Sequence, residues 1–121
     1  MTRNLSIGIV MLGVKELQRS IVFYRDKLGL PVKFQTPGFA FLDGGGVTLA
    51  LSEPMAKSAG QLTGGTELVF TVENVMAAYE QLHEKKIEFT QKPRPVTPTD
   101  WAASFNDPDG HRLSIFGPER G

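Results

Sequence analysis

Short apolar runs mark strands along this chain, and two longer segments repeat apolar residues at a helical spacing. The first run, Leu5–Val14, is rich in Ile, Val, Leu and Met and is interrupted by glycines, which is typical of a buried strand. In Glu16–Leu28 the apolar residues recur at helical spacing, so a helix is predicted, and Gly29 fits its left-handed end. Three further strands are predicted at Val32–Phe34, Gly38–Leu42 and Val47–Ser52.

The second half of the chain repeats this β-α-β-β-β order. Glu67–Val72 has the pattern of a strand, and Asn74 is a good N-cap for a second helix, whose apolar stripe is Val75, Ala78, Tyr79 and Leu82. Three strands are then predicted at Ile87–Thr90, Ala102–Asn106 and Arg112–Phe116. The connection Gln91–Asp100 holds three prolines, and its length predicts a lid or a rim.

An internal repeat supports the same division. Phe41–Pro54 matches Phe105–Pro118 without a gap at an offset of 64 residues, and the front halves of the two copies match in pattern at an offset of 58. We therefore expect one domain, residues 1–121, made of a first module 5–54, a linker 55–65 and a second module 66–118. The Gly, Ser and Ala content of residues 53–65 predicts a flexible linker that would also permit module exchange between chains.

Each predicted helix has one apolar stripe, which must be buried against the sheet of its own module. The opposite face of each sheet is then left to line a cavity. The expected fold is α+β, with two tandem βαβββ modules that form an open curved eight-stranded trough and carry their helices on the outer face.

Composition narrows the range of partners. Thirteen basic and thirteen acidic residues cancel without long runs of one sign, which argues against nucleic acid. The absence of cysteine excludes disulfides, thiolate nucleophiles and sulfur ligands for zinc or iron. The apolar stretch near the start suits neither a signal peptide nor a membrane span, so a soluble cytoplasmic protein without membrane contacts is expected.

Two segments of the chain resemble a known family. Val14–Leu30 is similar to the first helix, and Phe105–Leu113 to the last hairpin, of the vicinal oxygen chelate superfamily, which includes glyoxalase I, the bleomycin-resistance proteins and the extradiol dioxygenases. Together with the duplicated βαβββ pattern, the resemblance covers essentially the whole chain. It implies a trough that binds a small molecule and, in catalytic members, a divalent metal held by His, Glu or Gln side chains.

The resemblance places the four metal-ligand positions at Ile9, Ala50, Glu67 and Ser114. Glu67 alone carries a good ligand there, whereas a zinc, iron or manganese site needs three or more. The two histidines do not replace the missing ligands, because His83 lies late in a predicted helix and His111 lies in the Asp107–His111 turn. We therefore expect no metal and no cofactor.

Strand alternation defines the face that lines the expected trough. The candidate ligand-binding residues on this face are Ile9, Met11, Thr48, Ala50, Glu67, Val69, Arg112, Ser114 and Phe116. Trp101 is the tenth candidate, and it could cap the trough or serve as a core or interface residue. They form a mainly apolar floor with a few polar groups, as small-molecule pockets do.

Glu67 is the one candidate for a catalytic role. A carboxylate on a sheet face is expected to be solvated, paired with Arg112 or neutralised by a ligand cation. As a general base, Glu67 would need the apolar floor to raise its pKa.

Three functions remain open at this point. The first is a metal-independent protein, similar to the bleomycin-resistance branch, that binds a planar or aromatic small molecule in the trough. The second is a lyase, isomerase or dioxygenase of the same superfamily that uses Glu67 as base or a metal at another position. The third is a degenerate scaffold that pairs with another protein. A homodimer is expected under all three, because symmetric pairing covers sheet edges and apolar rims.

Overall fold

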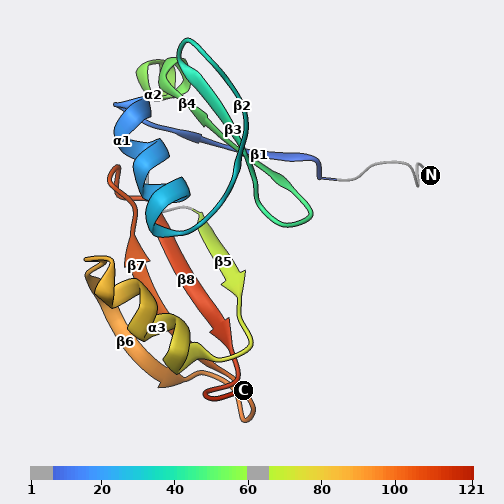
Figure 1. Ribbon diagram of the computed structural model, residues 1–121, viewed down its shortest axis with the longest axis vertical. Helices are drawn as coiled ribbons and strands as arrows, with labels where there is room; N and C mark the ends of the chain where they lie inside the picture. Colours follow the sequence, from blue (N-terminus) through green and yellow to red (C-terminus); the bar gives the residue numbers. More distant parts are fainter. Residues whose placement is uncertain (1–6, 60–65) are drawn as a thin grey trace, which may run out of the picture. The chain divides into compact units, whose positions relative to one another are not determined.

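The computed structural model describes residues 7–59 and 66–121. The chain divides into two compact units, Met1–Gln61 and Leu62–Gly121, and each contains one four-stranded sheet (Figure 1). The predicted α+β class, with eight strands in two βαβββ modules, is confirmed. Among the described residues, no helix is both long and apolar enough to cross a membrane.

The first unit has the strand order β1-β4-β3-β2, in which β1 and β4 are parallel and the other pairs antiparallel. Its elements are β1 (Ile9–Gly13), α1 (Leu17–Ile21), the π-helical segment η1 (Val22–Lys27), β2 (Val32–Thr36), β3 (Phe39–Asp43), β4 (Thr48–Ser52) and α2 (Glu53–Ala59). Because β1 and β4 are parallel, their connection must cross over the sheet, and α1 and η1 lie in that connection.

The apolar stripe predicted for the first helix is buried at three of its four positions, and the fourth, Leu28, is half-buried. Leu17, Ile21 and Tyr24 are at most 6% exposed, and α1 packs against β3 and β4. Leu42 of β3 and Leu49 and Leu51 of β4 are buried as well. The segment ends at Gly29, whose φ of 81° is the left-handed conformation expected of a helix end.

The second unit repeats the arrangement in the order β5-β8-β7-β6, again with one parallel pair, β5 and β8. Its elements are β5 (Glu67–Thr71), α3 (Val75–Glu84), β6 (Phe89–Pro95), β7 (Trp101–Asn106) and β8 (Arg112–Gly117). α3 packs against β6, β7 and β8 (Figure 1). The predicted N-cap is confirmed, because the Asn74 side chain accepts a hydrogen bond from the Ala77 N–H at 2.9 Å.

Two predicted connections differ in the structure. Residues 53–59 of the expected linker form helix α2, which packs against β1, and residues 60–65 lie outside the described residues. The expected lid Gln91–Asp100 is strand as far as Pro95, and a short turn follows in which the Val96 N–H donates to the Asp100 carbonyl. The prolines misled the prediction because β6 is an edge strand with register shifts, where missing N–H donors are tolerated.

The gapless alignment of the two copies is wrong by one residue at the first strand of each hairpin, β3 and β7. Phe41 pairs with Ala50 in the first sheet, but it is Ser104 that pairs with Ser114 in the second. The offset is therefore 64 for β4 and β8 but 63 for β3 and β7, because the second hairpin turn holds one more residue. The two phenylalanines aligned by sequence consequently face opposite ways, and Phe105 is fully buried in the core under α3.

Candidate functional site

On each sheet we call the face turned away from α1 or α3 the opposite face. On the second sheet, strand register places Glu67 beside Arg112, Val69 beside Ser114 and Thr71 beside Phe116. The next strands add further members in register with these: Ser104 beside Ser114, Ala102 beside Phe116, Gln91 beside Ser104 and Arg94 beside Ala102. The opposite face of this sheet therefore collects several polar side chains from all four strands.

Five of these side chains form one hydrogen-bonded group, which we call the polar network: Glu67, Gln91, Ser104, Arg112 and Ser114. The Oε2 atom of Glu67 accepts from Arg112 Nε at 2.7 Å and from Ser114 Oγ at 2.5 Å. Arg112 Nη2 also donates to Gln91 Oε1 at 3.2 Å. Ser104 Oγ lies 2.8 Å from Ser114 Oγ, and since Ser114 gives its one hydroxyl proton to Glu67, Ser104 is the donor in that pair.

The polar network fixes the charge of Glu67. Hydrogen bonds from Ser114 and then Arg112 lower the pKa of the Glu67 carboxyl, against a smaller opposing effect of burial. The general-base hypothesis needs an apolar floor that raises this pKa, whereas the neighbouring side chains of this face are donors and the pKa is lowered. Of the three surroundings considered for Glu67, pairing with Arg112 is confirmed. A carboxylate stabilised in its ionised form is a weaker base, so the site gives no support to base catalysis by Glu67.

Arg94 adds a second guanidinium beside the polar network. Its charge contributes to the lowering of the Glu67 pKa, although less than the two hydrogen bonds do. Arg94 Nη1 is buried and makes no hydrogen bond. This is unusual, because nearly all buried polar groups in folded proteins are paired.

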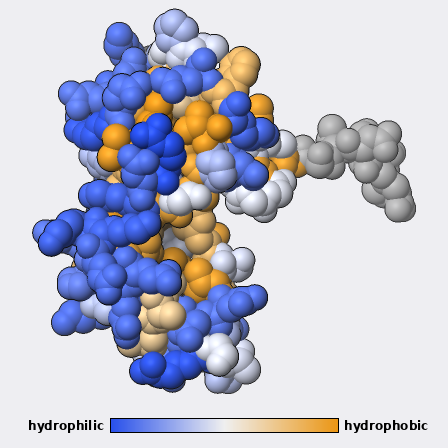
Figure 2. All heavy atoms as spheres, viewed as in Figure 1, coloured by the Kyte–Doolittle hydropathy of each residue, from blue (hydrophilic) through white to orange (hydrophobic). Residues whose placement is uncertain are grey.

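The opposite face of the first sheet is apolar and aromatic. Phe34 pairs with Phe41, and their rings meet edge to face with centroids 5.5 Å apart, while Phe39 and Phe41 stack at 6.3 Å. Ile9 and Phe34 are 55% and 58% exposed, and Figure 2 shows apolar side chains that reach the surface among polar ones. Thr48 lies on the same face, and its Oγ1 accepts a hydrogen bond from Lys33 Nζ at 2.8 Å.

Register shows which positions of the two sheets are equivalent, and at four of them the chemistry changes from apolar to polar. The pairs are Ile9 with Glu67, Phe34 with Gln91, Phe41 with Ser104 and Ala50 with Ser114. The duplicated fold thus presents a hydrocarbon surface in one module and a hydrogen-bonding surface in the other.

The strand register places nine of the ten predicted ligand-binding residues on the two opposite faces. On the first sheet these are Ile9, Met11, Thr48 and Ala50, and on the second Glu67, Val69, Arg112, Ser114 and Phe116. Trp101 is the exception, because it pairs with Gly117 and Pro95 in register with the α3-covered face. A capping role for Trp101 is not supported by this placement. Whether the other nine bind a ligand stays a prediction.

The side chains at the implied metal positions do not fit a metal. Ile9 and Ala50 have no ligand atom, and the Ser114 hydroxyl is used as a donor to Glu67. The remaining carboxylate is engaged by two donors on one oxygen. Within residues 7–59 and 66–121, no three His, Cys, Asp or Glu side chains come together in a group able to hold a metal ion.

The two histidines lie apart from both opposite faces. His83 is exposed in the last turn of α3 and stacks on Tyr79 with ring centroids 6.0 Å apart. His111 lies in the hairpin turn, where its backbone N–H donates to Asp107 Oδ1 at 2.8 Å. Both placements agree with the structural roles expected from the sequence.

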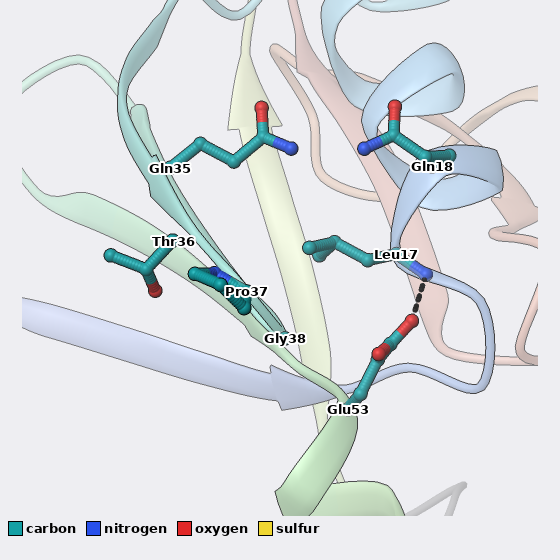
Figure 3. Close-up of a pocket in the computed structure, with 7 residues that line it drawn as sticks. All are labelled: Leu17, Gln18, Gln35, Thr36, Pro37, Gly38 and Glu53. Carbon is teal, nitrogen blue, oxygen red and sulfur yellow. Dashed lines mark hydrogen bonds between the residues drawn. The ribbon is translucent and has the colours of Figure 1, made fainter.

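A pocket of about 510 Å³ lies within the first unit, between α1 and the β2–β3 hairpin. Figure 3 shows the carboxamides of Gln18 and Gln35 turned toward each other across it, with the Leu17 side chain below them in this view. Glu53 is the titratable residue of its lining, and its Oε2 atom accepts the Leu17 N–H at 2.7 Å. This contact caps α1, so the pocket offers no pair of reactive groups for acid and base chemistry.

Sequence reasoning missed part of both opposite faces. The prolines around Gln91 and Arg94 predict a lid there, and the gapless repeat aligns Phe41 with the core residue Phe105. The signal that could have found Phe41 is the alternation through Phe39, Phe41 and Asp43, continued across the hairpin to Thr48 and Ala50. Gln91 and Arg94 had no such signal, because β6 departs from regular register between them.

Comparison with known proteins places the chain in a family. The family model of the Glyoxalase/Bleomycin resistance protein/Dioxygenase superfamily matches residues 6–115. The uncharacterized protein YraH of Bacillus subtilis (strain 168) is 32% identical over an alignment of 122 positions, and the alignment covers 88% of this chain and 94% of YraH.

Solved structures agree with this assignment. A glyoxalase/bleomycin resistance protein/dioxygenase from Nocardioides has 25% identity and a TM-score of 0.80, with 100% of this chain and 88% of that chain covered. TnmS3, an antibiotic-binding protein from Streptomyces sp. CB03234, has 20% identity and a TM-score of 0.81, with 98% and 99% covered. Lactoylglutathione lyase from Agrobacterium tumefaciens has 19% identity and a TM-score of 0.79, with 98% and 97% covered. This chain belongs to the Glyoxalase/Bleomycin resistance protein/Dioxygenase superfamily.

Proposed function

We propose that the protein is a metal-independent small-molecule-binding protein that takes a planar or aromatic ligand on the opposite face of its first sheet. The observation that carries this proposal is the aromatic cluster of Phe34, Phe39 and Phe41. Beside it, Ile9 and Met11 are 55% and 38% exposed. Large exposed apolar side chains grouped on one surface are typical of binding sites, and aromatic rings favour stacked or edge-to-face partners.

The superfamily and the donor set both support binding without a metal. The superfamily includes bleomycin-resistance proteins, and TnmS3, which shares the fold, is described as binding an antibiotic. At the four implied metal positions of this chain, Glu67 is the one side chain with a strong ligand atom, and it is held by Arg112 and Ser114.

A thermal-shift screen with polycyclic antibiotics, flavins and aromatic metabolites tests the proposal. A ligand at a hundred times its dissociation constant stabilises the folded state by about 2.7 kcal/mol. For a domain of this size, that corresponds to a rise in Tm of roughly 10 °C. If no compound in a broad aromatic set raises the Tm, the proposal fails.

Matched variants localise the binding. Phe34→Ala removes an exposed ring from the cluster, so it should weaken a hit at least about tenfold at little cost to folding. Val22→Ala removes another exposed apolar side chain, from η1, and should leave the affinity unchanged. Equal losses from both variants would place the ligand elsewhere.

The alternative function in the same superfamily is a lyase, isomerase or dioxygenase. The fold shared with lactoylglutathione lyase is compatible with it, but the lowered pKa of Glu67 does not favour a base at this position. Elemental analysis of protein purified without chelator separates the two functions. Stoichiometric Zn, Ni, Mn or Fe that is lost in Glu67→Gln would establish a metal enzyme and reject the metal-independent proposal.

We further propose that the protein forms a homodimer. The strand order makes β1 and β2 the edges of the first sheet, and both edges carry exposed apolar side chains, Ile9 and Phe34. Pairing of two chains protects such edges and apolar surface. Light scattering at micromolar concentration should give twice the monomer mass, and a monomer would reject the proposal.

A further inference from the structure

We propose that the opposite face of the second sheet holds an oxyanion-binding site built around Arg94 and Arg112, which takes a carboxylate or phosphate group. This inference goes beyond the proposed function, because it concerns a site within the second unit alone. It rests on the arrangement of charges and on one unpaired donor within that unit.

The first step is the charge balance. Arg94 and Arg112 bring two permanent positive charges to this face, while Glu67 is the one carboxylate in the polar network. Arg112 uses Nε on Glu67 and Nη2 on Gln91, and the electrostatic effect of Arg94 reaches Glu67 as well. One carboxylate between two guanidiniums leaves a net positive charge that an anion would neutralise.

The second step is the unpaired donor. Arg94 Nη1 is buried without a hydrogen-bond partner, and a buried polar group in that state is costly. Arg94 stands in register with Ala102, and Ala102 with Phe116, and neither of these two side chains can accept a hydrogen bond from the guanidinium. A carboxylate or phosphate oxygen is the acceptor that a guanidinium binds most strongly, often through two parallel hydrogen bonds.

The third step is the contrast with the first sheet. The positions equivalent to Gln91, Ser104 and Ser114 are Phe34, Phe41 and Ala50, which offer no hydrogen bond to a charged group. The surface of the second sheet therefore differs in the chemistry it can recognise, and an anionic group is the partner that its donors fit.

The test compares benzoate with benzamide, which differ mainly in charge, and adds inorganic phosphate as a probe without a ring. Binding is followed by NMR titration of the arginine Nε–H signals in the whole protein. We expect benzoate to bind at least about tenfold more tightly than benzamide and to shift the Arg94 signal. Phosphate should shift the same signal if the site accepts phosphoryl groups, and benzoate alone should do so if it is restricted to carboxylates.

Arg94→Met is the matched variant, because it keeps an unbranched side chain and removes the unpaired charge, so the fold should be retained. It should abolish the preference for benzoate, whereas Lys92→Met removes a neighbouring exposed positive charge and should preserve it. An unchanged preference in Arg94→Met, or equal affinities for benzoate and benzamide in the unmodified protein, would overturn the oxyanion site.

The two proposals fail separately. If neither benzoate nor phosphate shifts the Arg94 signal while aromatic compounds still raise the Tm in a Phe34-dependent way, the oxyanion site is rejected and the proposed function stands. If the anions bind at Arg94 but no aromatic compound binds at the first sheet, the proposed function is rejected and the oxyanion site stands.

Discussion

Ser114 Oγ lies 2.5 Å from Glu67 Oε2, and this contact joins the last strand of the second sheet to its first. The equivalent residues of the first sheet, Ala50 and Ile9, can form no such bond. The hydroxyl of Ser114 therefore marks where the two copies of one fold diverged in chemistry, and it holds Glu67 ionised together with Arg112.

Replacement of Glu67 by Gln should make the free energy of unfolding less dependent on pH in the acidic range. The folded-state pKa of Glu67 is below its unfolded value, so its stabilising effect is present above the unfolded pKa and is lost as the pH falls through the folded pKa. Since the side chain is 35% exposed, we expect a cost of at most about 1 kcal/mol in Glu67→Gln at pH 7, which becomes smaller as the pH falls below the unfolded pKa, for example at pH 3. Urea unfolding at both pH values measures this, with the exposed Glu84→Gln as control. A cost that grows in acid would contradict the prediction.

Glu53 should stabilise the start of α1 although it lies in a different helix. Its carboxylate accepts the Leu17 N–H, while Glu16 at the N-cap position makes no capping bond with its side chain. We expect Glu53→Ala to cost about 1 kcal/mol in urea unfolding, as loss of a helix cap does, and Glu53→Gln to cost less because its amide oxygen can still accept. Glu16→Ala should stay within about 0.5 kcal/mol. A larger loss in Glu16→Ala than in Glu53→Ala would refute the assignment.

Gly117 should tolerate no side chain. A Cβ atom there would lie 2.0 Å from the Val72 carbonyl oxygen, so the backbone of β8 or of the β5 end would have to move. We expect Gly117→Ala to destabilise the protein by about 1 to 3 kcal/mol, the usual range for overpacking, or by more. Gly8→Ala is the control, because nothing lies within 4 Å of the position that its Cβ would take, and its unfolding midpoint should be unchanged. Similar midpoints for both variants would be the contrary result.

The sequence predicts the type and order of the eight strands and of the helices before β2 and β6. These elements each have one buried side, and that side is visible in the sequence as an apolar stripe or as alternation. Three features escaped it for physical reasons. Helix α2 forms in a segment rich in small residues, where Ser52 Oγ accepts the Met55 N–H at its start. β6 continues through prolines at a sheet edge. The hairpin turn after Asn106 is one residue longer than its counterpart, since Asp107 accepts two backbone N–H groups within it.

For the site, alternation predicted the positions that share a face but not the partners of Glu67, which come from side chains reaching across strands.

The one-residue shift between the hairpins leads to a direct test on two phenylalanines that the sequence repeat aligns. Phe105 is fully buried and meets Phe89 edge to face at 5.2 Å, whereas Phe41 is half-buried on the opposite face of the first sheet. Phe105→Ala should therefore cost about 3 to 5 kcal/mol, as large core truncations do, and Phe41→Ala less than about 2 kcal/mol. Urea unfolding compares the two, and the aromatic ligand screen should show the reverse order, with binding lost in Phe41→Ala. Equal costs in unfolding would mean that the gapless alignment describes the fold and that Phe41 belongs to the core, which would remove the central ring from the proposed binding face.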